Sequence, residues 1–218
     1  SVVRNGKRVC VDSDGQSCVS GVWEACGVTV RDYCGGMKFG ICNEIFQGWK
    51  FEDAVAYAKK AGYDAIEHGT FIDDEGLELL LARDVPCVPA LYFEKASVER
   101  GREFGLSQRV IDGHQETLEG GAESCRKILK AGGRLGMGGD YGFGWCPHGE
   151  YAKELSFFVN YVGFSPLDTL KCATKTGAEI LGRGHEIGTL SPGKLADVLV
   201  VEGDVVKNIT LLEDRANI

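Results

Sequence analysis

An imidazole and a carboxylate each follow a short apolar segment of the kind that forms a buried strand. His68 ends the first segment, after Ile66 and Glu67, and Asp140 ends the glycine-rich segment 132–139. If both segments are strands of one parallel sheet, these side chains lie at the carboxyl ends of strands, where barrel enzymes build their active sites. Imidazole and carboxylate also bind divalent metal ions such as zinc, and a carboxylate there can move a proton. Spacing alone does not separate this site from a loop histidine and a turn aspartate.

Composition narrows the range of partners. The chain has 218 residues, of which 44% are hydrophobic and 26% charged, which is enough for one sizeable core. The net charge of −8 and the scattered Lys and Arg predict neither nucleic acid nor an anionic membrane surface as a partner. No run of about 18 apolar residues predicts a membrane span. Nine cysteines without a CxxC pair or a secretory signal predict free thiols and a cytoplasmic location.

Apolar spacing predicts alternating helices and strands. Helices are expected over residues 21–33, 51–61, 107–130, 151–162 and 167–181, and another after the acidic run 73–75. Strands are expected over residues 8–12, 65–66, 85–92, 132–139 and 196–201. Such alternation is typical of a parallel sheet, in either a barrel or a doubly wound fold. The last strand follows a Ser-Pro-Gly turn and predicts a second, smaller β element.

Several motifs resemble the amidohydrolase superfamily, in the branch of imidazolonepropionase-like enzymes, metal-dependent prolidases and Xaa-Arg or Xaa-Pro carboxypeptidases. The strand-six segment of that family resembles AGYDAIEHGTFIDDE at residues 61–75, and its strand-eight Gly-Thr-Asp resembles MGGD at residues 137–140. The resemblance continues in family order through PHG (147–149), EL (154–155), SPL (165–167), AT (173–174) and GTLSPGKLAD (188–197).

The resemblance implies a fold and a set of site residues. The fold would be an α/β, TIM-like (β/α)8 barrel, incomplete over residues 1–183, with strands of a small β-sandwich in residues 184–218. His68 would be the strand-six metal ligand, and Asp140 would bind metal and serve as general base and acid. Tyr92 stands where related carboxypeptidases hold the substrate's carboxylate. His148, in the loop after Asp140, would be either a substrate contact or a residue that orders the loop.

The chain also departs from the family pattern. It has no His-x-His for strand one, and no histidine before residue 68 for strand five. Lys38 is the only nearby lysine that could match the carboxylated lysine of strand four. We therefore expect the first third of a full-length enzyme to be absent. Because open sheet edges invite association, we also expect pairing with a second copy, with a missing segment or in a swapped arrangement.

Two readings of the function remain. The first is a hydrolase of amide or peptide bonds in dipeptides or N-acyl amino acids. It would use one or two divalent metal ions, with zinc as the first candidate. The second is a catalytically inactive fragment that acts through association, most simply as a homo-oligomer. A nucleotide-binding domain is disfavoured, because the glycines of residues 132–144 do not reproduce GxGxxG between a strand and a helix.

Overall fold

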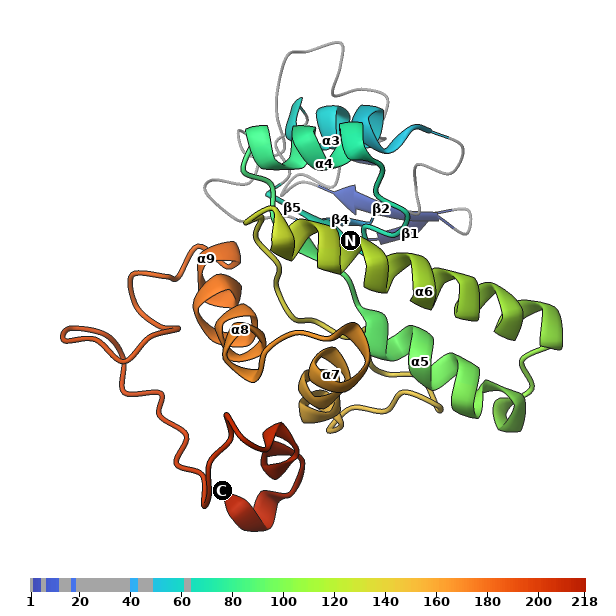
Figure 1. Ribbon diagram of the computed structural model, residues 1–218. Coiled ribbons are helices and arrows are strands. Elements are labelled where there is room, and N and C mark those ends of the chain that lie inside the picture. Colours follow the sequence, from blue (N-terminus) through green and yellow to red (C-terminus); the bar gives the residue numbers. More distant parts are fainter. Residues whose placement is uncertain (1, 5–6, 12–16, 19–39, 43–48, 61–63) are drawn as a thin grey trace.

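A parallel sheet with helices on both sides positions His68 and the segment that leads to Asp140 (Figure 1). The structure is a computed structural model that describes residues 2–4, 7–11, 17–18, 40–42, 49–60 and 64–218. Its parallel strands are ordered β4-β5-β6, namely Gly40–Cys42, Ala65–Glu67 and Cys87–Val88. A second, antiparallel sheet is formed by β1 (Val2–Arg4), β2 (Lys7–Val11) and β3 (Ser17–Cys18).

Helices connect the parallel strands, so the predicted alternation is confirmed over this stretch. β4 leads through α3 (Phe51–Lys60) to β5, and β5 leads through α4 (Asp74–Ala82) to β6. Beyond β6, the chain forms α5 (Leu91–Arg100), a short 3-10 turn and the long α6 (Gln108–Lys130), and then returns to the sheet at Leu135. In Figure 1, α3 and α4 lie on one side of these strands and α6 on the other.

Local sequence signals account for two of the helix starts. Asp73 caps α4, because its side chain accepts a hydrogen bond from the Gly76 N–H at 2.8 Å. Ser107 caps α6 in the same way, accepting from the Val110 N–H. Both helices were predicted at these positions. The glycines of α6 do not interrupt it, and at Gly121 an added Cβ would lie 2.5 Å from the Leu91 side chain. That glycine lets α6 lie close to α5.

Two predicted strands are shorter than their apolar patterns suggest. The strand expected over residues 85–92 ends at Val88, because Ala90 adopts a left-handed backbone (φ 52°) and α5 begins one residue later. The strand expected over residues 132–139 is reduced to one parallel bridge, between Leu135 and Cys87. Glycines at 136, 138 and 139 supply no side chains to hold a longer strand against the helices.

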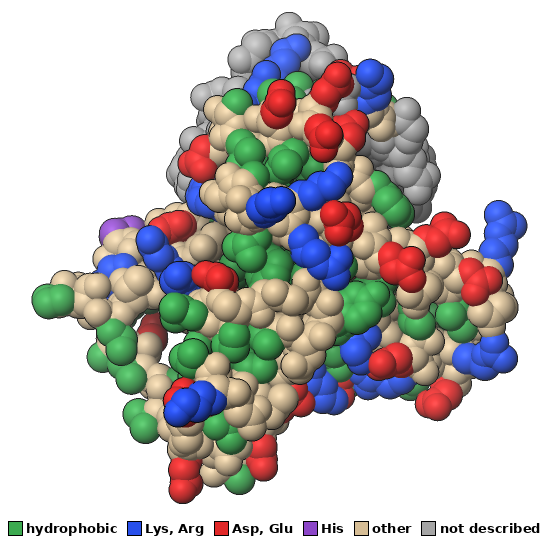
Figure 2. Space-filling view, in the orientation of Figure 1, with side chains coloured by type: hydrophobic (Ala, Val, Ile, Leu, Met, Phe, Trp, Pro, Cys, Tyr) green, Lys and Arg blue, Asp and Glu red, His purple; other side chains and the backbone are tan. Residues whose placement is uncertain are grey.

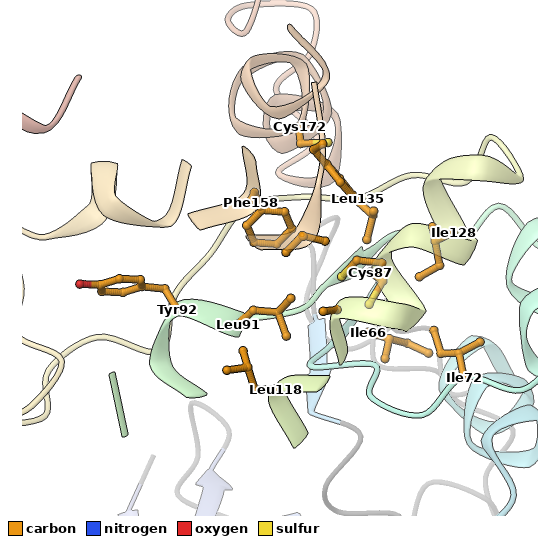
Figure 3. Packing of buried hydrophobic residues seen from close by; sticks show 14 of the residues in the cluster. Ile66, Ile72, Cys87, Leu91, Tyr92, Leu118, Ile128, Leu135, Phe158 and Cys172 are labelled. Atoms are coloured by element: carbon orange, nitrogen blue, oxygen red, sulfur yellow. The ribbon is translucent and has the colours of Figure 1, made fainter. Parts of the chain in front are cut away.

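The core fills the space between the sheet, α6 and the helices that follow (Figure 3). Those helices are α7 (Tyr151–Phe157), α8 (Pro166–Lys171) and α9 (Gly177–Ile180), joined by π-helical turns at Phe158–Val162 and Cys172–Thr176. The predicted helices over residues 151–162 and 167–181 are thereby confirmed. The largest fully buried side chains include Phe158, Ile66, Leu80, Leu91, Ile128 and Leu135.

The C-terminal segment differs from expectation. Residues 184–218 contain turns and two 3-10 helices, Ile209–Glu213 and Arg215–Asn217, but no strand. The predicted strand at 196–201 was wrong here, because a strand needs a neighbour to pair with its backbone, and Val198, Leu199 and Val200 are 54%, 59% and 78% exposed. No helix in the described ranges is long and apolar enough to cross a bilayer. The predicted helix at 21–33 and Lys38 lie outside the described residues.

Candidate functional site

His68 and Asp140 follow strand-like segments that end at one edge of the parallel sheet. Ile66 of β5 pairs with Cys87 of β6, and Cys87 in turn bridges to Leu135, in each case in parallel. The chain therefore leaves all three positions in the same direction. Since neighbouring strands lie about 4.8 Å apart, the backbones at Ile66 and Leu135 are about 10 Å apart, with β6 between them.

His68 sits at a sharp turn of the backbone. Its φ is 72°, a left-handed value that non-glycine residues seldom adopt, and Gly69 follows with φ 56°. The His68 N–H donates to the Val88 carbonyl at 2.7 Å, which fixes the turn against β6. An added Cβ at Gly69 would lie 2.3 Å from the Cys87 sulfur, so only glycine fits there. The imidazole is half-buried.

Glu67 is the acidic neighbour of this histidine. It ends β5 and lines a cavity of about 880 Å³ that extends towards α8 and α9. Burial raises the pKa of Glu67, and the nearby His68 lowers it in part.

Asp140 is exposed and opens a tight loop. The Gly142 N–H donates to the Cys146 carbonyl at 2.9 Å, and the Cys146 N–H donates to the Phe143 carbonyl at 3.1 Å. Gly142 has φ 119°, a conformation that favours glycine. The loop therefore closes on itself directly after Asp140.

Tyr92 lies in the first turn of α5 and its hydroxyl is already engaged. It donates to Glu150 Oε2 at 3.1 Å, and Arg100 Nη2 donates to its oxygen at 3.2 Å. Arg100 also pairs with Glu150 at 2.8 Å, and Lys153 pairs with the other Glu150 oxygen at 2.6 Å. Burial, followed by the charge of Glu150, raises the pKa of Tyr92. A substrate carboxylate at Tyr92 would have to replace Glu150 as the partner of these cations.

His148 and Tyr92 are joined by a row of aromatic rings that passes the residue after Asp140. His148 Nδ1 and the Tyr151 hydroxyl are 3.1 Å apart. The Tyr151 ring meets Tyr141 edge-on at 4.7 Å, and Tyr141 stacks on Tyr92 at 6.1 Å. The structure therefore brings Tyr92, His148 and the neighbour of Asp140 to one region, whereas His68 lies on the far side of β6.

Glu154 is a polar residue of this region that the sequence analysis did not select. It lies in α7, is 3% exposed, and lines a cavity of about 820 Å³ together with Gly139 and Tyr141. Burial raises its pKa to about 8. Its spacing from Phe157 and Phe158, three and four residues later, places it on the buried face of the helix. A charged residue on an apolar helix face was the signal available in the sequence.

Among the described residues, no three His, Cys, Asp or Glu side chains lie close enough to hold a metal ion. His68 and Asp140 are two candidate ligands, and the bridging candidate Lys38 lies outside the described ranges. Structural and catalytic zinc sites use three or four protein ligands. The described residues therefore do not form a complete metal site by themselves.

Known proteins resemble this chain over most of its length. Imidazolonepropionase of Geobacillus sp. (strain WCH70) is 29% identical over 125 residues, covering 56% of this chain and 30% of that protein. Ochratoxinase of Aspergillus niger is 27% identical over 167 residues, covering 73% of this chain and 32% of that protein. The chain thus spans about a third of the length of these relatives.

Solved structures agree with the sequence comparison. A putative prolidase from Bifidobacterium longum superposes with a TM-score of 0.71 at 28% identity, covering 84% of this chain and 45% of that one. An Xaa-Pro dipeptidase with bound methionine gives 0.64 at 26% identity, covering 75% and 40%. The model of the Amidohydrolase family matches residues 52–218, which include His68, Asp140 and Glu154. The chain belongs to the amidohydrolase family.

Proposed function

We propose that this chain forms part of a metal-dependent hydrolase that cuts an amide or peptide bond in a dipeptide or N-acyl amino acid. The observation that supports the proposal is the parallel pairing of three segments, because β5 ends one residue before His68 and the bridged Leu135 lies five residues before Asp140. The carboxyl ends of parallel strands are where enzymes with (β/α) folds bind their substrates. The names of the relatives, which include an imidazolonepropionase and an Xaa-Pro dipeptidase, support a carbon–nitrogen bond as the target.

Asp140 is the residue proposed to move the proton. Its exposed carboxylate can take a proton from a water molecule that attacks the substrate carbonyl, and can then give it to the leaving amine. The same residue would act as base and then as acid, so the protein ends the cycle in its starting state. Tyr92 and His148, at the two ends of the aromatic row, are proposed as substrate contacts.

The proposal requires one or two bound divalent metal ions, with zinc as the first candidate. His68 and Asp140 would be two of the ligands, and Lys38 is the candidate for a bridging ligand. The remaining ligands have to come from outside the described residues or from another copy of the chain, as in the proposed homo-oligomer. We also propose that residues 1–183 are a partial (β/α) barrel domain, that residues 184–218 belong to a smaller domain, and that the location is cytoplasmic.

The second candidate is an inactive fragment that acts through association. It is favoured by the absence of a three-ligand group among the described residues, and by the exposed apolar side chains of the C-terminal segment. Large apolar side chains in water are typical of surfaces that meet a partner. These side chains are Leu190, Leu195, Val198, Leu199 and Val200.

Metal content separates the two candidates. Elemental analysis would be made on the purified chain, on Asp140→Asn, and on Asp112→Asn as a matched change at an exposed position of α6. One or more zinc ions per chain, lost in Asp140→Asn but kept in Asp112→Asn, would support the hydrolase. Hydrolysis of N-acetyl amino acids and Xaa-Pro dipeptides would then be measured on the same three proteins. No bound metal in any of them would favour the inactive fragment.

A further inference from the structure

A cavity of about 820 Å³ lies between α7, the glycine-rich segment 137–139 and the C-terminal segment. Its walls are mostly apolar, and Figure 2 shows hydrophobic side chains around the hollow beside the C-terminal segment. The volume falls within the range of small-molecule sites, about 300–1,000 Å³. The apolar lining includes Met137, Leu155, Leu170, Val201, Leu212 and Ile218.

Glu154 is a buried polar group in this apolar wall. The residue is 3% exposed, and its Oε1 atom has no hydrogen-bond partner among the described residues. A buried polar atom without a partner destabilises the folded state, because it has lost its hydrogen bonds to water. Such atoms are rare in native proteins and call for a missing water or ligand. Because burial raises the pKa of Glu154 to about 8, its carboxyl is mostly protonated at pH 7.

Tyr141 provides a second unpartnered group in the same cavity. Its hydroxyl is buried and has no hydrogen-bond partner among the described residues, although the ring is held between Tyr92 and Tyr151. Burial raises the pKa of Tyr141, and the charge of Glu154 is the next cause. Both groups line the same cavity, so one ligand in it can meet both.

We propose that this cavity binds a primary amine on an apolar body, with the nitrogen between Glu154 and Tyr141. An ammonium group has three N–H donors, so it can donate to both the Glu154 carboxylate and the Tyr141 oxygen. The apolar walls offer no polar partners to the rest of the ligand. The cavity therefore favours an amine whose remaining part is aromatic or aliphatic. Binding converts the neutral Glu154 to a carboxylate, and its proton passes to the solvent.

The other titratable groups near Glu154 do not supply this proton. The charge of Glu154 also acts on the thiols of Cys125 and Cys146. Burial raises the pKa of each thiol well above 7, so both stay protonated at pH 7. Glu213 and Arg215 line the cavity from the exposed C-terminal segment. The proposal does not depend on hydrolysis, so it can hold or fail independently of the proposed function.

Calorimetric titration with 2-phenylethylamine tests the proposal, with 2-phenylethanol as the neutral probe of similar shape. The proteins are the unmodified chain, Glu154→Gln, and Glu213→Gln as a matched change at the cavity wall. A charge-assisted hydrogen bond contributes about 1.5–3 kcal/mol, so Glu154→Gln should weaken amine binding by about 10- to 100-fold. Glu213→Gln should leave it within about threefold, and the alcohol should bind equally to all three.

A second measurement needs no variant. Titration of the unmodified chain at pH 7, in two buffers of different ionisation enthalpy, should show proton release with the amine and none with the alcohol. Any one of four results would overturn the proposal. The first three are no amine binding at millimolar concentration, equal loss in both variants, and amine binding without proton release. The fourth is equal binding of amine and alcohol, which would show that the cavity recognises only the apolar body.

Discussion

Replacing the buried Glu154 by glutamine should change how the stability of the chain depends on pH. The folded chain raises the pKa of this carboxyl from 4.5 to about 8. Between these values the unfolded chain releases the proton while the folded chain keeps it. The unfolded state then binds fewer protons, so the free energy of unfolding falls as the pH rises through this window.

The size of the effect follows from the shift. Each pH unit above the ordinary value of 4.5 favours unfolding by about 1.4 kcal/mol for this group, up to a pH near 8. The destabilisation by Glu154 is therefore about 1 kcal/mol at pH 5 and about 3 kcal/mol at pH 7. Glutamine has a similar shape and does not titrate. Its buried amide adds a cost that is independent of pH, so only the change with pH identifies the carboxyl.

Urea unfolding at pH 5, 6, 7 and 8 would measure this difference. The free energy of unfolding of Glu154→Gln, minus that of the unmodified chain, should rise by about 2 kcal/mol between pH 5 and pH 7. The same difference for Glu213→Gln, at an exposed position, should be flat. A flat difference for Glu154→Gln would refute the reasoning, because it would show that the carboxyl ionises equally easily in the folded and unfolded chain.

Two further changes test other parts of the structure. Arg100 and Lys153 hold the pKa of Glu150 at about 2. Glu150→Gln should therefore lower the free energy of unfolding by about 1–2 kcal/mol at pH 7. Urea unfolding should show that this loss becomes smaller as the pH falls from 4.5 towards 2. An equal loss at pH 7 and pH 3 would contradict that origin. Phe158→Ala removes a fully buried ring and should cost about 3–5 kcal/mol by urea unfolding, whereas Tyr161→Ala, 41% exposed, should cost less than half as much. Equal losses would show that the core is not centred on Phe158.

The sequence by itself determined the elements that local interactions specify. The helices over α3, α4 and α6 were predictable because apolar spacing, an acidic first turn and the caps Asp73 and Ser107 all act within a few residues. The order of strand and helix indicated parallel strands, so His68 and Asp140 could be assigned to one edge of a sheet. The family resemblance followed from motifs that the chain carries in order.

Only the tertiary structure decided which long-range partners those elements meet. Tyr92 was expected to end a strand and contact a substrate carboxylate, but it lies in the first turn of a helix and its hydroxyl donates to Glu150, 58 residues later. Glu154 is part of the EL motif at residues 154–155, to which the sequence analysis assigned no function. Its burial depends on the packing of α7 against the rest of the chain. The apolar run at 196–201 was expected to form a strand, yet none of the described residues pairs with it as a strand. Hydrogen-bond partners and burial depend on residues distant in sequence, and a local pattern cannot specify them.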